Sequence, residues 1–135
     1  MENEPSESAD PQRGELSRFL LGFKYAFRGL WHALRTQRNV RVHLAAALVV
    51  TIAGILLHVA AVEFAMLYVA IAGVFVAEMF NTVIEICVDL ASPEYHPLAR
   101  TAKDVAAGAV LLSAILAVVI GLFVLGPHVW TLLVR

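Results

Sequence analysis

Three long apolar stretches, separated by short polar segments, occupy most of the chain after residue 41. Residues 42–62 contain no Asp, Glu, Lys or Arg, and at about 1.5 Å per residue a helix of this length crosses a hydrocarbon core of about 30 Å. The pattern predicts a second apolar helix over about 64–90 and a third over about 104–126, with Pro127 as its terminator. Residues 90–103 contain two X-Pro pairs, which predict a loop with at most one helical turn.

A different pattern precedes the first apolar stretch. Over about 17–38, aromatic and aliphatic residues such as Phe23 and Phe27 recur at helical spacing, and cations such as Lys24 and Arg28 fall on the other side of the helical wheel. This segment is expected to be a basic amphipathic helix in the lipid headgroup region; the alternative is a helix packed on a soluble partner. Residues 1–16 are acidic and rich in Ser and Pro, which predicts a disordered tail ahead of one membrane domain over 17–135.

Composition and charge agree with a membrane protein. Of the 135 residues, 60% are hydrophobic and 16% are charged, whereas soluble domains average about 45–50% and 25%. This composition argues against a water-soluble globular protein. Seven Lys and Arg residues precede the first span, none lies in the first turn and two flank the second loop. The positive-inside rule therefore places the N-terminus and the second loop in the cytoplasm. A single cysteine excludes a disulfide within one chain.

Four polar residues in the second apolar stretch form a stripe. Glu78, Asn81, Glu85 and Asp89 are spaced so that all four lie within an arc of about 80° on a helix. Carboxylates inside a span cost about 2.5–3.5 kcal/mol each on insertion scales, so the stripe is expected to face a bundle interior or a wet cavity and to carry function. The alternative is that it only joins helices, a task that uncharged Asn, Ser or Thr would perform without that cost.

Clustered carboxylates near a cationic loop suit Mg²⁺, which prefers oxygen ligands and usually retains waters and a substrate phosphate. Lys103 and Asp104 are expected at the start of the third helix, where Lys103 and free backbone N–H groups could hold phosphate oxygens. The alternative is a solvated helix boundary with Asp104 as its cap. The sequence contains no P-loop, protein-kinase, zinc-protease or serine-hydrolase motif. A proton-coupled transporter fits these features equally well.

Two blocks of sequence add a resemblance. The block E-M-F-N-T-V-I-E-I-C-V-D over 78–89 and the later runs S-P-E-Y-H and A-K-D-V-A-A-G-A-V-L resemble the prokaryotic diacylglycerol kinase family, which includes the undecaprenol kinases. The resemblance extends without gaps from about Arg18 into the third span. It implies an all-α integral membrane enzyme with three spans and a surface helix, working as a homotrimer that transfers the ATP γ-phosphoryl group to the primary hydroxyl of a lipid.

The resemblance also implies roles for the residues of the stripe. Glu78 matches the family's general base, and Asn81 matches the amide beside it. Glu85 matches a carboxylate that holds Mg²⁺ on the ATP phosphates, and Asp89 would support the metal or nucleotide site. Gln37 departs from the pattern, because many family members have Glu there as a second metal ligand; its carbonyl oxygen brings no negative charge, which puts the number of bound ions in question.

The remaining positions belong to the nucleotide site that the resemblance implies. They are Lys103 and Asp104 at the phosphates, Glu94 and His96 near the adenosine, Arg18 near the γ-phosphate and Tyr25 beside the nucleotide. For the last four, an interfacial anchor or a plain loop residue is an equally weighted interpretation.

The resulting hypothesis is a bacterial inner-membrane lipid kinase that uses MgATP and has no nucleic-acid partner. Diacylglycerol is the first expected acceptor, giving phosphatidic acid, and undecaprenol is the second, because the segment N-V-R-V-H-L over 39–44 is similar to the undecaprenol kinase branch. A small coupled transporter and an inactive trimeric family member are the alternatives, the latter suggested by Gln37.

Overall fold

The structure is a computed structural model that describes residues 11–134, with side chains from residue 14. Residues 1–10, most of the predicted acidic tail, and Arg135 lie outside the described residues. The described chain is all-helical. Its elements are α1 (Pro11–Thr36), α2 (Arg38–Leu56), α3 (Ala61–Ala91) and α4 (Pro97–Leu133).

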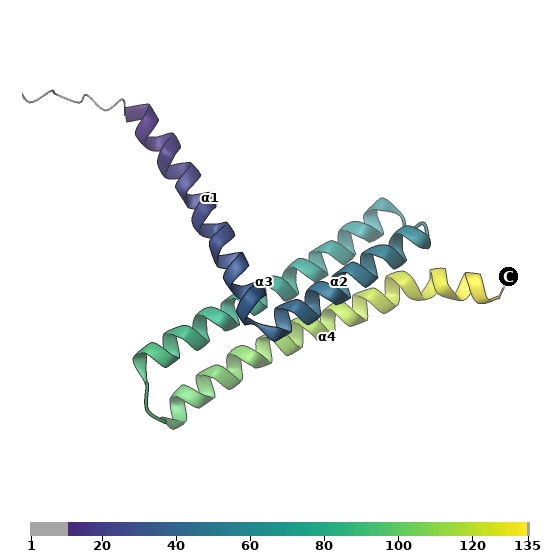
Figure 1. Cartoon of the computed structure of the whole chain (residues 1–135). Coiled ribbons are helices and arrows are strands. Elements are labelled where there is room, and N and C mark those ends of the chain that lie inside the picture. The colour runs from purple at the N-terminus through teal and green to yellow at the C-terminus, as the bar shows by residue number, and fades with distance from the viewer. Residues whose placement is uncertain (1–10, 135) are drawn as a thin grey trace, which may run out of the picture. The chain divides into compact units, whose positions relative to one another are not determined.

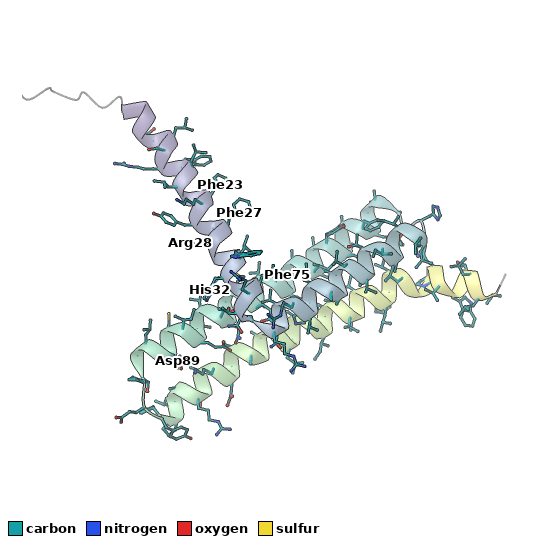
Figure 2. All side chains as sticks on the ribbon, viewed as in Figure 1. Phe23, Phe27, Arg28, His32, Phe75 and Asp89 are labelled. Atoms are coloured by element: carbon teal, nitrogen blue, oxygen red, sulfur yellow. The ribbon has the colours of Figure 1, made fainter. Side chains whose placement is uncertain are left out.

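The chain divides into two compact units, residues 1–32 and 33–135, and each is described by itself. In the first unit, α1 begins at Pro11, six residues before the predicted start, with a residue type that is favoured at the first position of a helix. Figure 2 shows Phe23 and Phe27 on one side of α1 and Arg28 on the other, as the helical spacing predicts. The amphipathic character of this helix is therefore confirmed.

In the second unit α2, α3 and α4 run side by side (Figure 1), and α3 packs most extensively on α4. The connections 57–60 and 92–96 are short, so consecutive helices are antiparallel neighbours. All three helices are long and apolar enough to cross a membrane. Most of their large apolar side chains are exposed in the single chain, as expected for helices whose outer faces meet lipid or other protein.

The turn between α2 and α3 is sharper than the sequence suggested. α2 ends at Leu56, six residues before the predicted end, because His58 takes a left-handed φ of 55°, a conformation in which histidine is enriched among non-glycine residues. The backbone N–H of Ala60 donates a 2.9 Å hydrogen bond to Glu63 Oε2, which caps the start of α3. A Cβ on Gly54 would lie 2.7 Å from Phe64 Cζ, so only glycine allows this ring to pack against α2.

The connection between α3 and α4 differs from its prediction. The loop covers 92–96 alone, and α4 begins at Pro97, seven residues earlier than expected. Proline fits the first position of a helix because it has no N–H to leave unpaired, and the His96 ring accepts a hydrogen bond of 3.2 Å from the Leu98 N–H. Lys103 and Asp104 consequently lie in the second turn of α4, where backbone N–H groups are bonded within the helix. The predicted free N–H groups beside Lys103, and the capping role of Asp104, are wrong.

Pro127 does not terminate the last helix, as the sequence had suggested. α4 continues through it to Leu133. Proline removes one intrahelical hydrogen bond, but membrane helices tolerate this where neighbouring groups bond the backbone instead. The carbonyl that loses its helical partner is that of Phe123; the adjacent His128 places Nδ1 2.9 Å from the carbonyl oxygen of Val124, one residue further on.

Candidate active site

The predicted polar stripe lies on one face of α3, and its side chains become more exposed from Glu78 toward Asp89. Glu78 is 2% exposed and Asn81 8% exposed, Glu85 is half-buried, and the Asp89 side chain is 67% exposed. Figure 2 shows Asp89 near the end of α3 that leads to the loop. Thr82, beside the stripe, is buried and donates its hydroxyl hydrogen to the Glu78 carbonyl oxygen at 2.9 Å. The three carboxylates therefore lie in different environments, from the interior of the bundle to its edge.

Glu78, the most buried polar side chain described, faces a histidine from α2. His43 Nε2 lies 3.2 Å from Glu78 Oε1. The two groups are not aligned as a hydrogen bond, and Oε1 has no hydrogen-bond partner among residues 14–134. A buried carboxylate is costly without a partner, and His43 is the group within ion-pair distance of it. The sequence did not predict His43 as a site residue.

Glu85 is the centre of a second contact between α2 and α3. Its Oε1 accepts a 2.9 Å hydrogen bond from Asn81 Nδ2, and its Oε2 accepts one of 3.4 Å from Gln37 Nε2. Gln37 is the N-cap of α2, with extended backbone angles, and its side chain does not bond the helix end. Its amide is therefore free to reach α3. The structure thus brings together Gln37, Asn81 and Glu85.

These two contacts show one register between the helices. His43 follows Gln37 by six positions, and their partners Glu78 and Glu85 are seven positions apart in the opposite direction, as expected for antiparallel helices. At about 1.5 Å per residue, the two carboxylates lie about 10 Å apart along α3. The site therefore has a deep end at Glu78 and a shallower end at Glu85.

The shallower end has the chemistry of a magnesium site. Its donors, the Glu85 carboxylate and the amide oxygens of Asn81 and Gln37, are the hard oxygen ligands that Mg²⁺ prefers. Asn81 Oδ1 is buried and has no hydrogen-bond partner within residues 14–134, so it is free to act as a ligand. Among the described residues, no three His, Cys, Asp or Glu side chains gather as a metal cluster. The residues thus fit an ion that takes its remaining ligands from water and phosphate.

Asp89 contacts α4. Lys103 Nζ donates a hydrogen bond of 2.5 Å to Asp89 Oδ1, and the two side chains are 38% and 67% exposed. The pair therefore lies at the water-accessible end of the stripe, beyond Glu85. Asp89 was expected to support the metal or nucleotide, but its charge is already partnered by the lysine expected to bind phosphate.

The Asp89–Lys103 pair borders a hollow of about 310 Å³ formed by the end of α3, the loop and the start of α4. This hollow also contains Glu94 and His96, so four of the predicted residues meet there. Asp104 does not line it; this side chain is 73% exposed and lies 3.9 Å from the Arg100 guanidinium. The other polar residues lining the hollow are Ser92, Tyr95 and Arg100.

Arg18 and Tyr25 belong to the separate unit that ends at His32. Both are exposed on α1. The Arg28 guanidinium lies 5.3 Å from the centre of the Tyr25 ring, a cation–π distance. The structure therefore places these two predicted residues on the amphipathic helix.

A larger cavity of about 560 Å³ lies between α2, α3 and α4. Its lining is apolar along all three helices, with side chains such as Val50, Leu67 and Val118. Among the described residues, His43 is the only ionisable one that lines it, and Glu78 does not. The cavity therefore meets the acidic site at a histidine.

Taken together, the fold and the site define a class: an all-helical membrane protein with a carboxylate site inside its apolar bundle and a charged hollow at the end of that site. The model of one family, prokaryotic diacylglycerol kinase, matches residues 24–125. The chain belongs to this family.

Individual relatives agree with the assignment. The chain is 44% identical over 115 residues to an undecaprenol kinase of Bacillus subtilis, covering 85% of this chain and 94% of that protein. It is 44% identical over 116 residues to a diacylglycerol kinase of Synechocystis, covering 85% and 66%, and 30% identical over 112 residues to a diacylglycerol kinase of Escherichia coli, covering 83% and 92%. The family is one of membrane lipid kinases that use ATP, so the transporter alternative is set aside.

His43 is the residue that analysis of the sequence missed. It lies in the segment N-V-R-V-H-L, which was used only to compare family branches. The position of His43 along the helix pair could nevertheless have been inferred from the sequence. A short turn forces residues at similar distances on either side of it to face each other. Pairing α2 with α3 about the turn at 57–60 places His43 level with Val74, one helical turn from Glu78, and so would have brought it close to the stripe.

Proposed function

We propose that this chain transfers the γ-phosphoryl group of MgATP to the primary hydroxyl of diacylglycerol, giving phosphatidic acid. The observation that carries the proposal is Glu78, a carboxylate that is 2% exposed within a helix long and apolar enough to span a membrane. Ionisable groups at such positions are costly and are kept for function. A lipid hydroxyl at the membrane interface is a substrate that a site inside the bundle can receive without extracting the lipid.

In the proposed mechanism, Glu78 is the base that receives the proton of the attacking hydroxyl. The acceptor oxygen forms a bond to the γ-phosphorus while the bond to the ADP oxygen breaks in line, and ADP leaves with that electron pair. General-base assistance of this kind contributes about 10²–10⁴-fold. Because Glu78 is enclosed by the bundle, water is excluded from the base, which limits hydrolysis of ATP.

The shallower end of the site would hold the nucleotide. Glu85, Asn81 and Gln37 would hold Mg²⁺, which when bound neutralises charge on the phosphates. The hollow at the loop would take the nucleotide, with Lys103 at the phosphates and Glu94 and His96 near the adenosine. Asp104, Arg18 and Tyr25 remain proposed nucleotide contacts, and Asp89 holds Lys103 in the free site until a phosphate of ATP takes its place.

The remaining parts of the proposal concern the assembly. We expect a homotrimer in the bacterial inner membrane, with the N-terminus and the loop 92–96 in the cytoplasm, where ATP is available. The large apolar surface of the three long helices supports association, because it exceeds what the chain can bury alone. The amphipathic α1 would lie at the membrane surface. Sedimentation in density-matched detergent tests the trimer, and a monomer at activity-supporting concentrations would contradict it.

Undecaprenol is the second candidate acceptor. The undecaprenol kinase of Bacillus subtilis matches this chain over 94% of its own length, and the segment N-V-R-V-H-L favours the same branch. Both acceptors carry a primary hydroxyl on an apolar chain, and apolar pockets discriminate weakly between chains. The mechanism above is therefore the same for either lipid.

The deciding experiment measures transfer of label from ATP to lipid in mixed micelles, with diacylglycerol and undecaprenol in parallel. We expect labelled lipid that depends on Mg²⁺ and is lost in Glu78→Gln. Glu63→Gln is the matched control, because it removes one carboxylate from the other end of α3 and should retain activity. The ratio of the two products identifies the acceptor. No labelled product from either lipid would contradict the proposal and favour the inactive trimeric scaffold.

A further inference from the structure

Glu78 and His43 share a contact but differ in their access to the cavity. The Glu78 side chain is 2% exposed and does not line the 560 Å³ cavity, whereas His43 does line it and its side chain is 25% exposed. The imidazole therefore lies between the buried carboxylate and the apolar space. A hydroxyl group that enters along this cavity meets His43 before it can meet Glu78.

The two ring nitrogens of His43 have different surroundings. Nε2 lies 3.2 Å from Glu78 Oε1, while the described residues show no hydrogen bond to Nδ1. With its proton on Nε2, the ring presents a bare lone pair at Nδ1. Catalytic hydrogen bonds are often poorly aligned until the substrate binds, which accounts for the imperfect alignment between the ring and Glu78.

From this geometry we propose that His43 relays the acceptor's proton to Glu78, an inference that rests on the proposed kinase function. The acceptor O–H gives its proton to His43 Nδ1 as its oxygen bonds to the γ-phosphorus. His43 Nε2–H gives its proton to Glu78 Oε1 in the same step. ADP leaves with the electrons of the broken bond, and the net change at the protein is one proton gained by Glu78.

A relay explains why the acid can be so deeply buried. A carboxylate 2% exposed cannot approach a bulky lipid headgroup without moving its helix, but an imidazole beside it can accept a proton on one nitrogen and release one from the other. A carboxylate behind the ring fixes the ring's tautomer and orientation, as in hydrolases that pair an acid with histidine, and here Glu78 also takes the proton that Nε2 releases. His43 therefore touches the reacting hydroxyl, and Glu78 acts through it.

The test compares His43→Ala with His43→Gln in the labelled-ATP assay. Glutamine can offer an N–H to Glu78 but cannot pass on a proton. We expect both variants to lose about 10²-fold or more in kcat, the range for a lost general base, with KM for ATP changed less than about threefold, or about 0.6 kcal/mol. Added imidazole should restore part of kcat to His43→Ala, since the cavity beside residue 43 can admit it. His58→Asn, in the turn outside the site, is the matched control and should respond to neither change.

Three results would overturn the relay while leaving the kinase intact. The first is a near-normal kcat in His43→Gln, which would show that the residue only positions Glu78. The second is a near-normal kcat in His43→Ala. The third is that imidazole does not raise the kcat of a folded His43→Ala chain. Thermal unfolding in detergent identifies variants that fail to fold, and His43→Asn then replaces them. An inactive parent chain would instead refute the proposed function, so the two failures are distinguishable.

Discussion

Lys103 has to exchange Asp89 for a nucleotide phosphate if it is to bind ATP as proposed, and the Asp89→Asn variant measures the cost of that exchange. In the structure the ammonium group donates a 2.5 Å hydrogen bond to the carboxylate. The variant removes the negative charge and keeps a side chain of nearly the same shape. We therefore expect it to bind ATP more tightly, because Lys103 no longer has to leave an ion pair.

The exposures of the two side chains set the magnitude. Two unit charges 2.5 Å apart attract by about 1.7 kcal/mol in bulk water. The Asp89 and Lys103 side chains are 67% and 38% exposed, and solvated pairs of this kind are worth about 0.2–1 kcal/mol once side-chain ordering is included. Because about 1.4 kcal/mol corresponds to tenfold in affinity, loss of the pair should lower KM for ATP by about 1.4- to fivefold.

The assay is the ATP dependence of lipid phosphorylation at saturating acceptor, with Glu63→Gln as the matched control. Glu63 also bridges α3 to α4, through a 3.5 Å contact between its Oε2 and His128 Nε2, but at the opposite end of the bundle. We expect no change in KM for that variant. A higher KM in Asp89→Asn would refute the reasoning and would show that Asp89 binds the metal or the nucleotide directly.

Three further variants test other contacts. Gln37→Glu replaces the amide that now lies 3.4 Å from Glu85 Oε2 with a second carboxylate. It should lower the Mg²⁺ concentration needed for half-maximal activity. An unchanged Mg²⁺ requirement in a titration would exclude position 37 as a ligand. Asn81→Leu removes the 2.9 Å hydrogen bond to Glu85 and the free amide oxygen, and should raise the Mg²⁺ requirement in the same titration. Gly54→Leu overfills the contact with Phe64 and should cost about 1–3 kcal/mol, seen as a lower unfolding temperature in detergent that Phe64→Leu partly restores; equal unfolding temperatures would show that the ring moves freely.

The sequence predicted those features that depend on one helix at a time. The spacing of Glu78, Asn81 and Glu85 fixes a shared face on any helix, and the structure shows that face turned inward over its first two members. The length of the apolar stretches likewise predicted three membrane-spanning helices. Such features follow from periodicity, which does not depend on how helices pack.

Features that depend on turn geometry were predicted less well. The two X-Pro pairs at 92–93 and 96–97 read alike as loop signals, yet only the second begins a helix, because His96 caps it and Pro97 occupies its first position. The early end of α2 depends on the left-handed backbone of His58, a conformation that most sequences with a histidine there do not adopt. These local choices move Lys103 from a helix start into a helix interior.

The inter-helix contacts have a consequence for how variants are interpreted. Glu63–His128 and Asp89–Lys103 join α3 to α4 at their two ends in one register, and His43–Glu78 and Gln37–Glu85 join α2 to α3 in another. The groups proposed to move protons and bind Mg²⁺ are therefore also packing contacts of the bundle. A substitution there removes a packing contact as well as a chemical group, and paired contacts are not additive. Catalytic loss at His43, Gln37 or Glu85 is consequently evidence of a chemical role only when the unfolding temperature of the same variant is unchanged.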